Sequence, residues 1–324
     1  MEVKAGIPLE NLEILAHVVD LDHVDRGLAE FENHFEGEKR SHLGQVMRIV
    51  CLVARHWVML DDDLVSELWS WTKTVSLPRQ GMTAKNKKVV IGLKDRPTIA
   101  RLLGLGFKLL REAAASPVLS RRKAVQAQIG FLMVLLLNAP GRIGNIGGIH
   151  LDRHVKIVGT GTERRIFIDF PEAEVKNSRA LMYELTAPTI EAFDLYMGRI
   201  RPKSVQSPEN RWLFPGEGEG HKGTSLLSEQ IGGLTSAEAG IRLTAHQYRH
   251  FRVFLHLRRS KFDITTVAKA LGHDEATCRK FYAWLSDEEA LANWDETLKL
   301  TQAELAPLID GTAPKPKRRR RRKS

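Results

Sequence analysis

The apolar residues of this chain change their period between residues 154 and 185, and this change limits the possible folds strongly. The segments "HVKIVG" (154–159) and "RRIFIDF" (164–170) alternate apolar and polar residues as strands do, and "TGTE" separates them. A third strand-like segment, "KNSRALMYEL", follows at 176–185. Apolar residues recur at helical spacing before and after this region. The pattern predicts a mostly α-helical protein with one small antiparallel β-sheet.

The chain before residue 116 is predicted to be a helical domain. Apolar residues fall at helical spacing in "GEKRSHLGQVMRIVCLVARHWVML" (37–60) and "DDDLVSELWSWTK" (61–73). Asp95 is a candidate cap for a further helix, because Pro97 follows near its first turn. The intervening "TAKNKKVV" is interpreted as a basic loop. Its candidate DNA contacts are Lys85, Lys87 and Lys88.

A domain boundary is predicted at "SPVLSRRK" (116–123), which combines a proline, two serines and three basic residues. A strongly apolar helix follows at 124–137, and then the strands and further helices extend to residue 300. We therefore expect a helical N-terminal domain (1–115), a mixed α/β domain (116–300) and a C-terminal segment (301–324). Residues 311–324 have little apolar surface to bury and are expected to be disordered.

Most of the net positive charge lies near the end of the chain. Residues 315–323 hold eight basic side chains, and subtracting them from the formal net charge of +10 leaves +2 for the rest. A DNA-binding surface on the body must therefore be a local patch. The tail is expected to add sequence-independent affinity, so deleting residues 313–324 should flatten the salt dependence of DNA binding. Its candidate DNA contacts are Arg318, Arg319 and Arg320.

Several classes of protein are excluded by the remaining composition. The two cysteines, Cys51 and Cys278, form no CxxC pair, which argues against a cysteine-rich zinc site and a disulfide scaffold. The start of the chain has no apolar signal-peptide core, and the longest apolar run, 131–137, is too short to span a bilayer. We expect a cytoplasmic, DNA-associated protein with no bound metal and no cofactor.

Four chemically active side chains are predicted to lie on or beside three consecutive short helices. In "TAHQYRHF" (244–251), His246 and Arg249 are three residues apart and project from one helix face. Asp263 is a candidate cap for the next helix, which ends at Gly272. The other two side chains, an imidazole and a phenol, follow in "LGHDEATCRKFYAW" (271–284). That segment carries His273 and, nine residues later, Tyr282.

These side chains suit phosphoryl transfer without a metal. A guanidinium group matches phosphate oxygens with paired hydrogen bonds, and a tyrosine hydroxyl can attack phosphorus. Taken alone, Tyr282 would be interpreted as a half-buried core residue and His273 as a helix C-cap; their spacing to His246 and Arg249 favours the site instead. The glycines of "GRIGNIGG" (141–148) are not followed by Gly-Lys-Ser/Thr, so a nucleotide site is not expected.

The pattern "LTAHQYRHF…VAKALGHDEATCRKFY" resembles the tyrosine recombinase, or phage integrase, family over roughly residues 116–300. That family has His-x-x-Arg, then Leu-Gly-His, then Tyr nine residues on. It also has an upstream Arg after an apolar helix, here Arg142 in "LLLNAPGRIGNIGGIHL", and a Lys in its sheet, here matched by Lys176 with Lys156 and Arg179 as nearby alternatives. A Glu or Asp often follows that first Arg by three residues, whereas Asn145 stands here.

The resemblance implies that the helical N-terminal domain (1–115) is a DNA-binding domain and that 116–300 is the catalytic domain, with a role for each matched residue. Tyr282 would attack the scissile phosphate and become a 3′-phosphotyrosine. Arg142 and Arg249 would hold the non-bridging oxygens of that phosphate. Lys176 would protonate the 5′-oxygen that leaves.

The two histidines of the motif also have implied roles. His246 would handle the tyrosine or phosphoryl proton, and His273 would donate a hydrogen bond to the phosphate. The resulting hypothesis is a site-specific DNA recombinase or integrase that acts on double-stranded DNA as a tetramer, with accessory directionality factors as possible partners. Two alternatives stay open: a DNA-binding protein of the same fold that does not cut, and a type IB topoisomerase-like enzyme that relaxes DNA.

Overall fold

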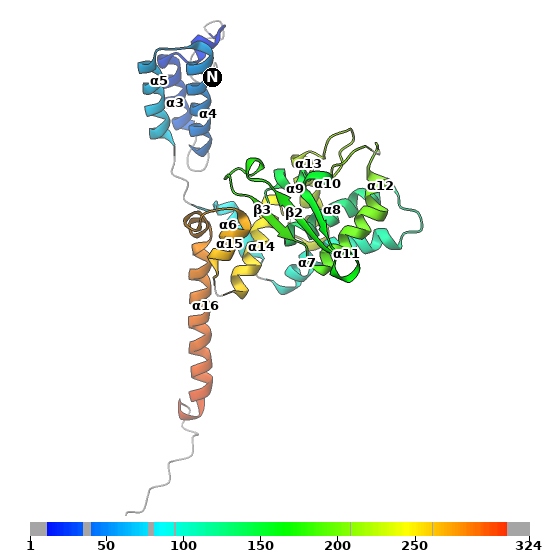
Figure 1. Ribbon diagram of the computed structural model, residues 1–324. Coiled ribbons are helices and arrows are strands. Elements are labelled where there is room, and N and C mark those ends of the chain that lie inside the picture. Colours follow the sequence, from blue (N-terminus) through cyan, green and yellow to red (C-terminus); the bar gives the residue numbers. More distant parts are fainter. Residues whose placement is uncertain are drawn as a thin grey trace, which may run out of the picture. The chain divides into compact units, whose positions relative to one another are not determined.

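The computed structural model describes residues 12–34, 40–76, 81–93, 95–207, 209–260 and 262–309. The chain divides into two compact units, Met1–Gln80 and Gly81–Ser324 (Figure 1). The boundary that we expected at 115/116 does not coincide with this division. Segments between residues 81 and 115 pack into the second unit instead, because the hydroxyl of Tyr248 donates to the carbonyl of Leu102 and Val90 and Leu110 join the second unit's core.

The first unit is a small helical bundle with its own core. Its elements are α2 (Leu15–Val18), α3 (Leu21–His34), α4 (Arg40–Val53), the π-turn η3 (Ala54–Val58) and α5 (Asp62–Val75). Apolar residues one turn apart on α4 face α5, as the helical spacing of the sequence predicts. The buried residues of this core are Val19, Val24, Met47, Cys51, Ala54, Val65 and Leu68.

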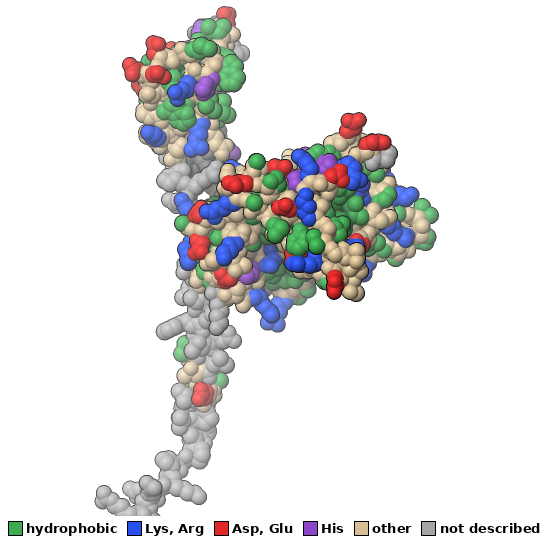
Figure 2. Space-filling model, in the orientation of Figure 1, with side chains coloured by type: hydrophobic (Ala, Val, Ile, Leu, Met, Phe, Trp, Pro, Cys, Tyr) green, Lys and Arg blue, Asp and Glu red, His purple; other side chains and the backbone are tan. Residues whose placement is uncertain are grey.

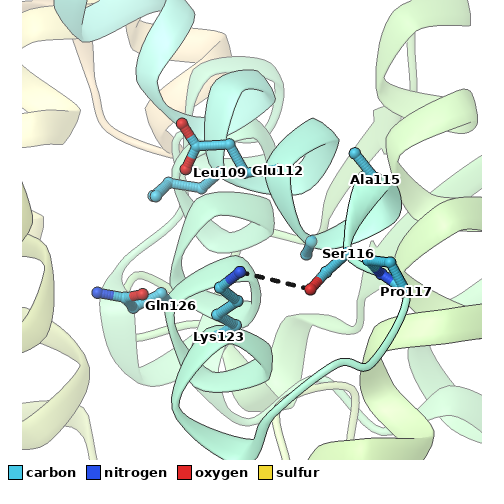
Figure 3. A pocket seen from close by; sticks show the side chains of 8 residues that line it. Leu109, Glu112, Ala115, Ser116, Pro117, Lys123 and Gln126 are labelled. Atoms are coloured by element: carbon cyan, nitrogen blue, oxygen red, sulfur yellow. Dashed lines mark hydrogen bonds between the residues drawn. The ribbon is translucent and has the colours of Figure 1, made fainter.

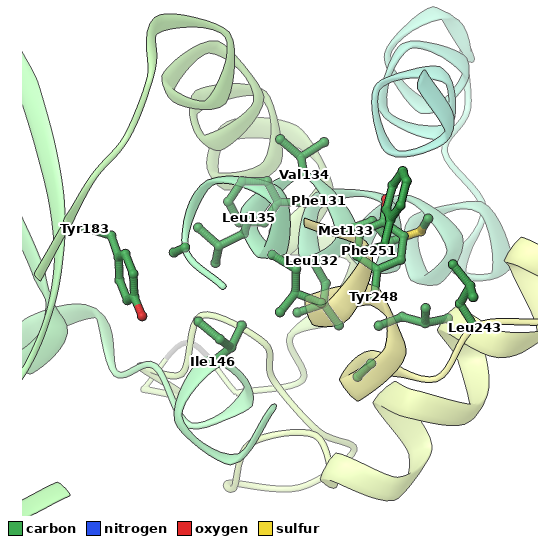
Figure 4. Packing of buried hydrophobic residues seen from close by; sticks show 14 of the residues in the cluster. Phe131, Leu132, Met133, Val134, Leu135, Ile146, Tyr183, Leu243, Tyr248 and Phe251 are labelled. Atoms are coloured by element: carbon green, nitrogen blue, oxygen red, sulfur yellow. The ribbon is translucent and has the colours of Figure 1, made fainter. Parts of the chain in front are cut away.

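The second unit is built around one buried helix. Its helices are α6 (Ala84–Gly92), α7 (Arg96–Ala115), α8 (Arg121–Asn138), α9 (Ile143–Gly147), α10 (Leu151–His154), α11 (Ala187–Leu195), η6 (Tyr196–Ile200), α12 (Arg201–Ser204), α13 (Thr224–Ala239), α14 (Ala245–Arg259), α15 (Ile264–Leu271) and α16 (Glu275–Ile309). Helix α8 contacts α7, α11, α12, α13 and α14. Its consecutive residues Phe131 to Leu135 are all buried in this core (Figure 4).

Two glycines let α7 and α8 approach closely. A Cβ on Gly106 would lie 2.5 Å from the carbonyl oxygen of Gly130, and a Cβ on Gly130 would lie 2.9 Å from that of Gly106. Larger side chains at these positions would force the helices apart. Arg142 lies four residues after the end of α8, so this packing contributes to the position of the arginine.

The β-sheet has three antiparallel strands in the order β1 (Val155–Val158), β2 (Arg165–Phe170) and β3 (Leu181–Glu184), which confirms the predicted fold class. Val155 pairs with Ile168, and Phe170 pairs with Leu181. Ile166, Ile168 and Phe170 are fully buried and alternate with more exposed residues, as expected for a sheet with one face on the core. The short helices η4 (Gly161–Glu163) and η5 (Glu172–Glu174) lie between the strands.

The interpretation of residues 83–90 as a loop was wrong, because they form the first turns of α6. Thr83 caps this helix by accepting a hydrogen bond from the backbone N–H of Asn86 at 3.3 Å. Val90 is buried against the second unit. The helix is short and its apolar residues form no clear stripe along one face. Its lysines therefore led to the loop interpretation.

The surface of the second unit is mixed in charge, as expected for the body of the chain. Figure 2 shows Lys and Arg side chains interspersed with Asp and Glu on the visible face. No helix within the described ranges is both long enough and apolar enough to cross a membrane. The candidate tail contacts and the segment 311–324, expected to be disordered, lie outside the described residues.

Candidate active site

Arg142 is the residue before α9, at the turn that follows α8. Gly141 forms this turn, where an added Cβ would lie 2.9 Å from Cδ1 of Ile146. Nη2 of Arg142 donates to Oδ1 of Asn177 at 3.1 Å and lies 3.1 Å from Nε2 of His273. Nη1 is buried and has no hydrogen-bond partner among the described residues. This half-buried cation therefore has one donor whose hydrogen-bonding capacity is unused.

A capping box begins α14 and determines which residues share its face. Thr244 Oγ1 accepts from the backbone N–H of Gln247, and the Gln247 side chain accepts from the backbone N–H of Thr244 at 2.9 Å. His246 and Arg249 then lie three residues apart on the helix. His246 is exposed, whereas Arg249 is buried and its Nη2 donates to the carbonyl oxygen of Leu271 at 3.0 Å. Arg249 is thereby held at the carboxyl end of α15.

The end of α15 places His273 beside Arg142. Asp263 caps the helix by accepting from the backbone N–H of Thr266 at 3.0 Å, and Gly272 ends it with a left-handed φ of 61°. The backbone N–H of His273 donates to the carbonyl oxygen of Ala268 at 3.0 Å. Both the cap and the stop agree with the sequence prediction.

The loop between β2 and β3 ties the sheet to this same turn. The side chain of Asn177 donates through Nδ2 to the carbonyl oxygen of Gly272 at 2.7 Å. Nη1 of Arg179 donates to the carbonyl oxygen of His273 at 3.0 Å. Asn177 thus contacts both Arg142 and the α15–α16 turn, although neither of these lies near it in sequence.

Lys176 lies in the turn before Asn177 and is exposed. It lines an open groove of about 770 Å³ together with Arg142 and Asn145. Asn145 donates to the backbone carbonyl of Glu174 at 2.9 Å, and the Glu174 carboxylate lies 2.9 Å from Nε2 of the buried His154. Asn145 therefore anchors the loop that carries Lys176, although it provides no negative charge to the site.

The two alternatives to Lys176, which are Lys156 and Arg179, do not line this groove. Lys156 is an exposed residue of β1 and does not line the groove. Arg179 holds the carbonyl of His273. Of these three cations, Lys176 is the one that shares the groove with Arg142.

Tyr282 lies on the second turn of α16 and is only 3% exposed. Its hydroxyl lies 2.7 Å from Nδ1 of His250, a residue that is 4% exposed. The His250 ring is also edge-on to His246, with 4.5 Å between the ring centroids. Neither His250 nor Asn177 is among the site residues predicted from the sequence. His250 lies four residues after His246 on α14, so helical spacing contained a signal for it.

The electrostatics of the site keep its histidines neutral. Burial, reinforced by the cations of Arg249 and Arg142, lowers the pKa of His273 to about 4. Burial lowers the pKa of His250 to about 3, with His246 and Arg249 contributing. Desolvation followed by the charges of the two arginines also lowers the pKa of His246.

Burial raises the pKa of Tyr282, and the nearby Arg249 guanidinium offsets only part of this rise. Within the described part of the chain, neither Arg142 nor Arg249 forms an ion pair with a carboxylate. The site thus combines two uncompensated cations, three neutral imidazoles and a protonated phenol. Such a combination favours binding of a phosphate group, whose oxygens accept from arginine.

Of the remaining candidate DNA contacts, only the lysines of α6 lie within the described residues. Lys85 and Lys88 are exposed on α6, while Nζ of Lys87 lies 5.7 Å from the ring centroid of Trp284. The tail arginines 318–320 lie outside the described residues. Among the described residues, no three His, Cys, Asp or Glu side chains gather in a way that would hold a metal ion.

A second surface pocket, of about 430 Å³, lies between α7 and α8 (Figure 3). It is lined in part by Glu112, Ser116 and Lys123, and Nζ of Lys123 donates to the Ser116 hydroxyl at 3.4 Å. None of the predicted site residues lines this pocket. It lacks the paired guanidinium and imidazole groups of the Arg142 groove.

Comparison with known proteins gave matches among solved structures only, since no protein-family model and no curated protein matches. The XerH site-specific recombinase bound to palindromic difH substrate has a TM-score of 0.47 and 16% identity, covering 82% of this chain and 76% of that one. XerA recombinase has a TM-score of 0.38 and 16% identity, covering 82% and 83%. An integrase from mycobacterium phage Brujita has a TM-score of 0.29 and 14% identity, covering 89% and 78%. The chain is thus similar, at low identity, to solved structures of recombinases and a phage integrase.

Proposed function

We propose that this chain is a site-specific DNA recombinase or integrase of the tyrosine recombinase type. One observation carries the proposal: Arg142, with a buried and unpartnered Nη1, lies 3.1 Å from His273 in an open groove. Arg249 adds a second cation without a carboxylate partner in the described residues. This charge balance supports a DNA phosphate as the ligand, because a phosphodiester supplies both negative charge and hydrogen-bond acceptors.

The proposed reaction begins when the Tyr282 hydroxyl oxygen attacks phosphorus. A new bond forms between the tyrosine oxygen and phosphorus, and the phenolic proton passes to His246. The bond between phosphorus and the 5′-oxygen breaks, and Lys176 supplies the proton that makes this oxygen a hydroxyl. Arg142 and Arg249 stabilise the charge on the non-bridging oxygens. The products are a 3′-phosphotyrosine and a free 5′-hydroxyl.

Rejoining reverses these steps with a different strand. The 5′-hydroxyl of a partner strand attacks the phosphotyrosine, which restores a phosphodiester and frees Tyr282. The ester retains the energy of the broken bond, so the exchange requires neither ATP nor a metal ion. Two duplexes need four strand cleavages, and we therefore propose a tetramer on two DNA sites.

The test is formation of a covalent complex with nicked suicide DNA that carries candidate sites cloned from beside the gene. The protein is incubated with this DNA in excess EDTA and analysed on a denaturing gel. Wild type should give a covalent band and Tyr282→Phe should give none, because the variant lacks only the attacking oxygen. A band of equal intensity in the Tyr282→Phe protein would refute Tyr282 as the nucleophile.

A second candidate function is DNA binding without cleavage, and the burial of Tyr282 favours it. A hydroxyl that is enclosed at 3% exposure and bonded to His250 cannot reach a phosphate in this conformation. Wild-type protein that shifts the same DNA on a native gel and yet forms no covalent band would support this second function.

A further inference from the structure

Tyr282 is held by a group that does not belong to the sequence motif. Its hydroxyl lies 2.7 Å from Nδ1 of His250, and both side chains are almost completely buried. A tyrosine hydroxyl has one proton to donate, and Nδ1 of a neutral imidazole that carries its proton on Nε2 has one lone pair to accept it. The short distance and the burial of both groups define a single, enclosed hydrogen bond.

We infer that His250 is the resting-state holder of the candidate nucleophile: its Nδ1 accepts the hydroxyl proton of Tyr282 and keeps the phenol inside the second unit until DNA engages the groove. The role of Tyr282 as nucleophile rests on the proposed function. The holding of its hydroxyl by His250 is a property of the DNA-free protein and stands independently.

The surroundings of His250 keep its ring neutral. Burial, followed by the charges on His246, Arg249 and His273, lowers the pKa of His250. In the tautomer with its proton on Nε2, the neutral ring accepts at Nδ1, and the proton of the hydrogen bond stays on the tyrosine oxygen, whose own ionisation is opposed by burial. His250 thus holds Tyr282 as a phenol and does not deprotonate it in this state.

Attack on a phosphate requires this hydrogen bond to break. A nucleophilic oxygen must come within about 3 to 3.5 Å of phosphorus, and a DNA strand cannot enter a site where the tyrosine is 3% exposed. The Tyr282 side chain, or the beginning of α16 that carries it, has to move toward the groove. His250 is the polar group that this movement leaves behind.

The four tyrosines of the chain provide a direct readout. All four are buried, and their exposures are 8% for Tyr183, 0% for Tyr196, 0% for Tyr248 and 3% for Tyr282. The hydroxyls of Tyr196 and Tyr248 donate to backbone carbonyls of the core. These two residues are internal references for general loosening of the structure.

The experiment is nitration of the full chain by tetranitromethane without DNA, with each tyrosine quantified by peptide mass spectrometry. His250→Asn retains an amide group near the position of Nδ1, whereas His250→Leu removes all hydrogen bonding. Loss of the buried hydrogen bond in His250→Leu should raise the reactivity of Tyr282 relative to Tyr248 on the order of tenfold. His250→Asn should stay close to wild type in this ratio.

Expressing the result as a ratio removes the effect of partial unfolding, which would expose Tyr248 as well. Equal ratios in the two variants would overturn the inference, because packing and not hydrogen bonding would then hold Tyr282. A wild-type Tyr282 that reacts as fast as it does in urea would overturn it too. The outcome is separate from the covalent-complex assay, so failure of the proposed function and failure of this inference can be told apart.

Discussion

The two sides of the candidate site differ in their access to solvent. On the open side, Arg142 and Lys176 line a groove of about 770 Å³, and Arg142 keeps an unpartnered donor. On the closed side, Tyr282 and His250 are buried and bonded to each other. The open side thus presents cationic groups to an anion, whereas the closed side encloses Tyr282, the residue that is proposed to react with it.

The difference follows from the cost of burying each group. A neutral phenol can be enclosed with a single hydrogen bond, because its polar group is then satisfied. A guanidinium that is enclosed without an anion costs more free energy: Arg142 stays half-buried, and the buried Arg249 donates to the carbonyl oxygen of Leu271. If the proposed function holds, DNA binding on the open side and release of Tyr282 on the closed side would be separable steps.

The largest effect is expected on the open side from Arg142→Gln. Loss of this cation should reduce covalent-complex formation by roughly two to three orders of magnitude, since a group that stabilises phosphoryl charge is removed. The initial rate of band formation on the denaturing gel measures the change. The matched control is Arg164→Gln, whose guanidinium pairs with Asp194 and does not line the Arg142 groove, and it should leave the rate unchanged.

The next effect is a pH dependence of stability on the closed side. His250 has a folded pKa of about 3 and an unfolded value near 6.5, so acidification protonates the unfolded chain first. Stability from this group is complete above the unfolded pKa and is lost as pH falls toward 3. Between about pH 7 and pH 5, this residue alone should cost about 2 kcal/mol of unfolding free energy.

Urea unfolding at both pH values, followed by circular dichroism, tests this expectation in wild type and His250→Asn. The variant should lose less stability on acidification, because asparagine takes up no proton. The same loss in both proteins would mean that His250 titrates normally and that the closed side is open to water.

A smaller effect is expected where the two sides meet, at Asn177. Asn177→Asp preserves shape and places a carboxylate beside Nη2 of Arg142, which would then form an internal ion pair. Competition with DNA phosphate should weaken affinity by about tenfold, measured by native gel shift. Asn177→Ala removes the tie without adding charge and should weaken binding less. If both variants bind equally well, charge compensation at Arg142 does not matter.

The smallest effect concerns the lysines of α6. Lys85 is exposed, whereas Lys87 lies over the Trp284 ring, close to the closed side. If Lys85 contacts a phosphate, Lys85→Gln should reduce the slope of log affinity against log salt by about one. Lys87→Gln should change this slope less. A larger change of slope for Lys87→Gln than for Lys85→Gln would mean that Lys87, and not Lys85, contacts the phosphate.

Local features of the fold and site were predictable from short stretches of sequence. The strand alternation at 154–185 predicted the antiparallel sheet, and Asp263 and Gly272 predicted the ends of α15. These features depend on neighbouring residues only. The boundary at 115/116 and the loop at 83–90 did not match the structure, because α6 and α7 are placed by contacts with α14 and α8 far along the chain.

The sequence by itself determined which chemical groups are present and at what helical spacing: His246 and Arg249 on one face, His273 after a helix stop, and Tyr282 on the following helix. Only the tertiary structure decided that Asn177 bridges Arg142 and Gly272, and that His250 holds Tyr282. The physical reason is the sequence separation over which each interaction acts. Capping and periodicity act over a few residues, whereas these hydrogen bonds join residues 32 to 95 positions apart and form only when the core has packed.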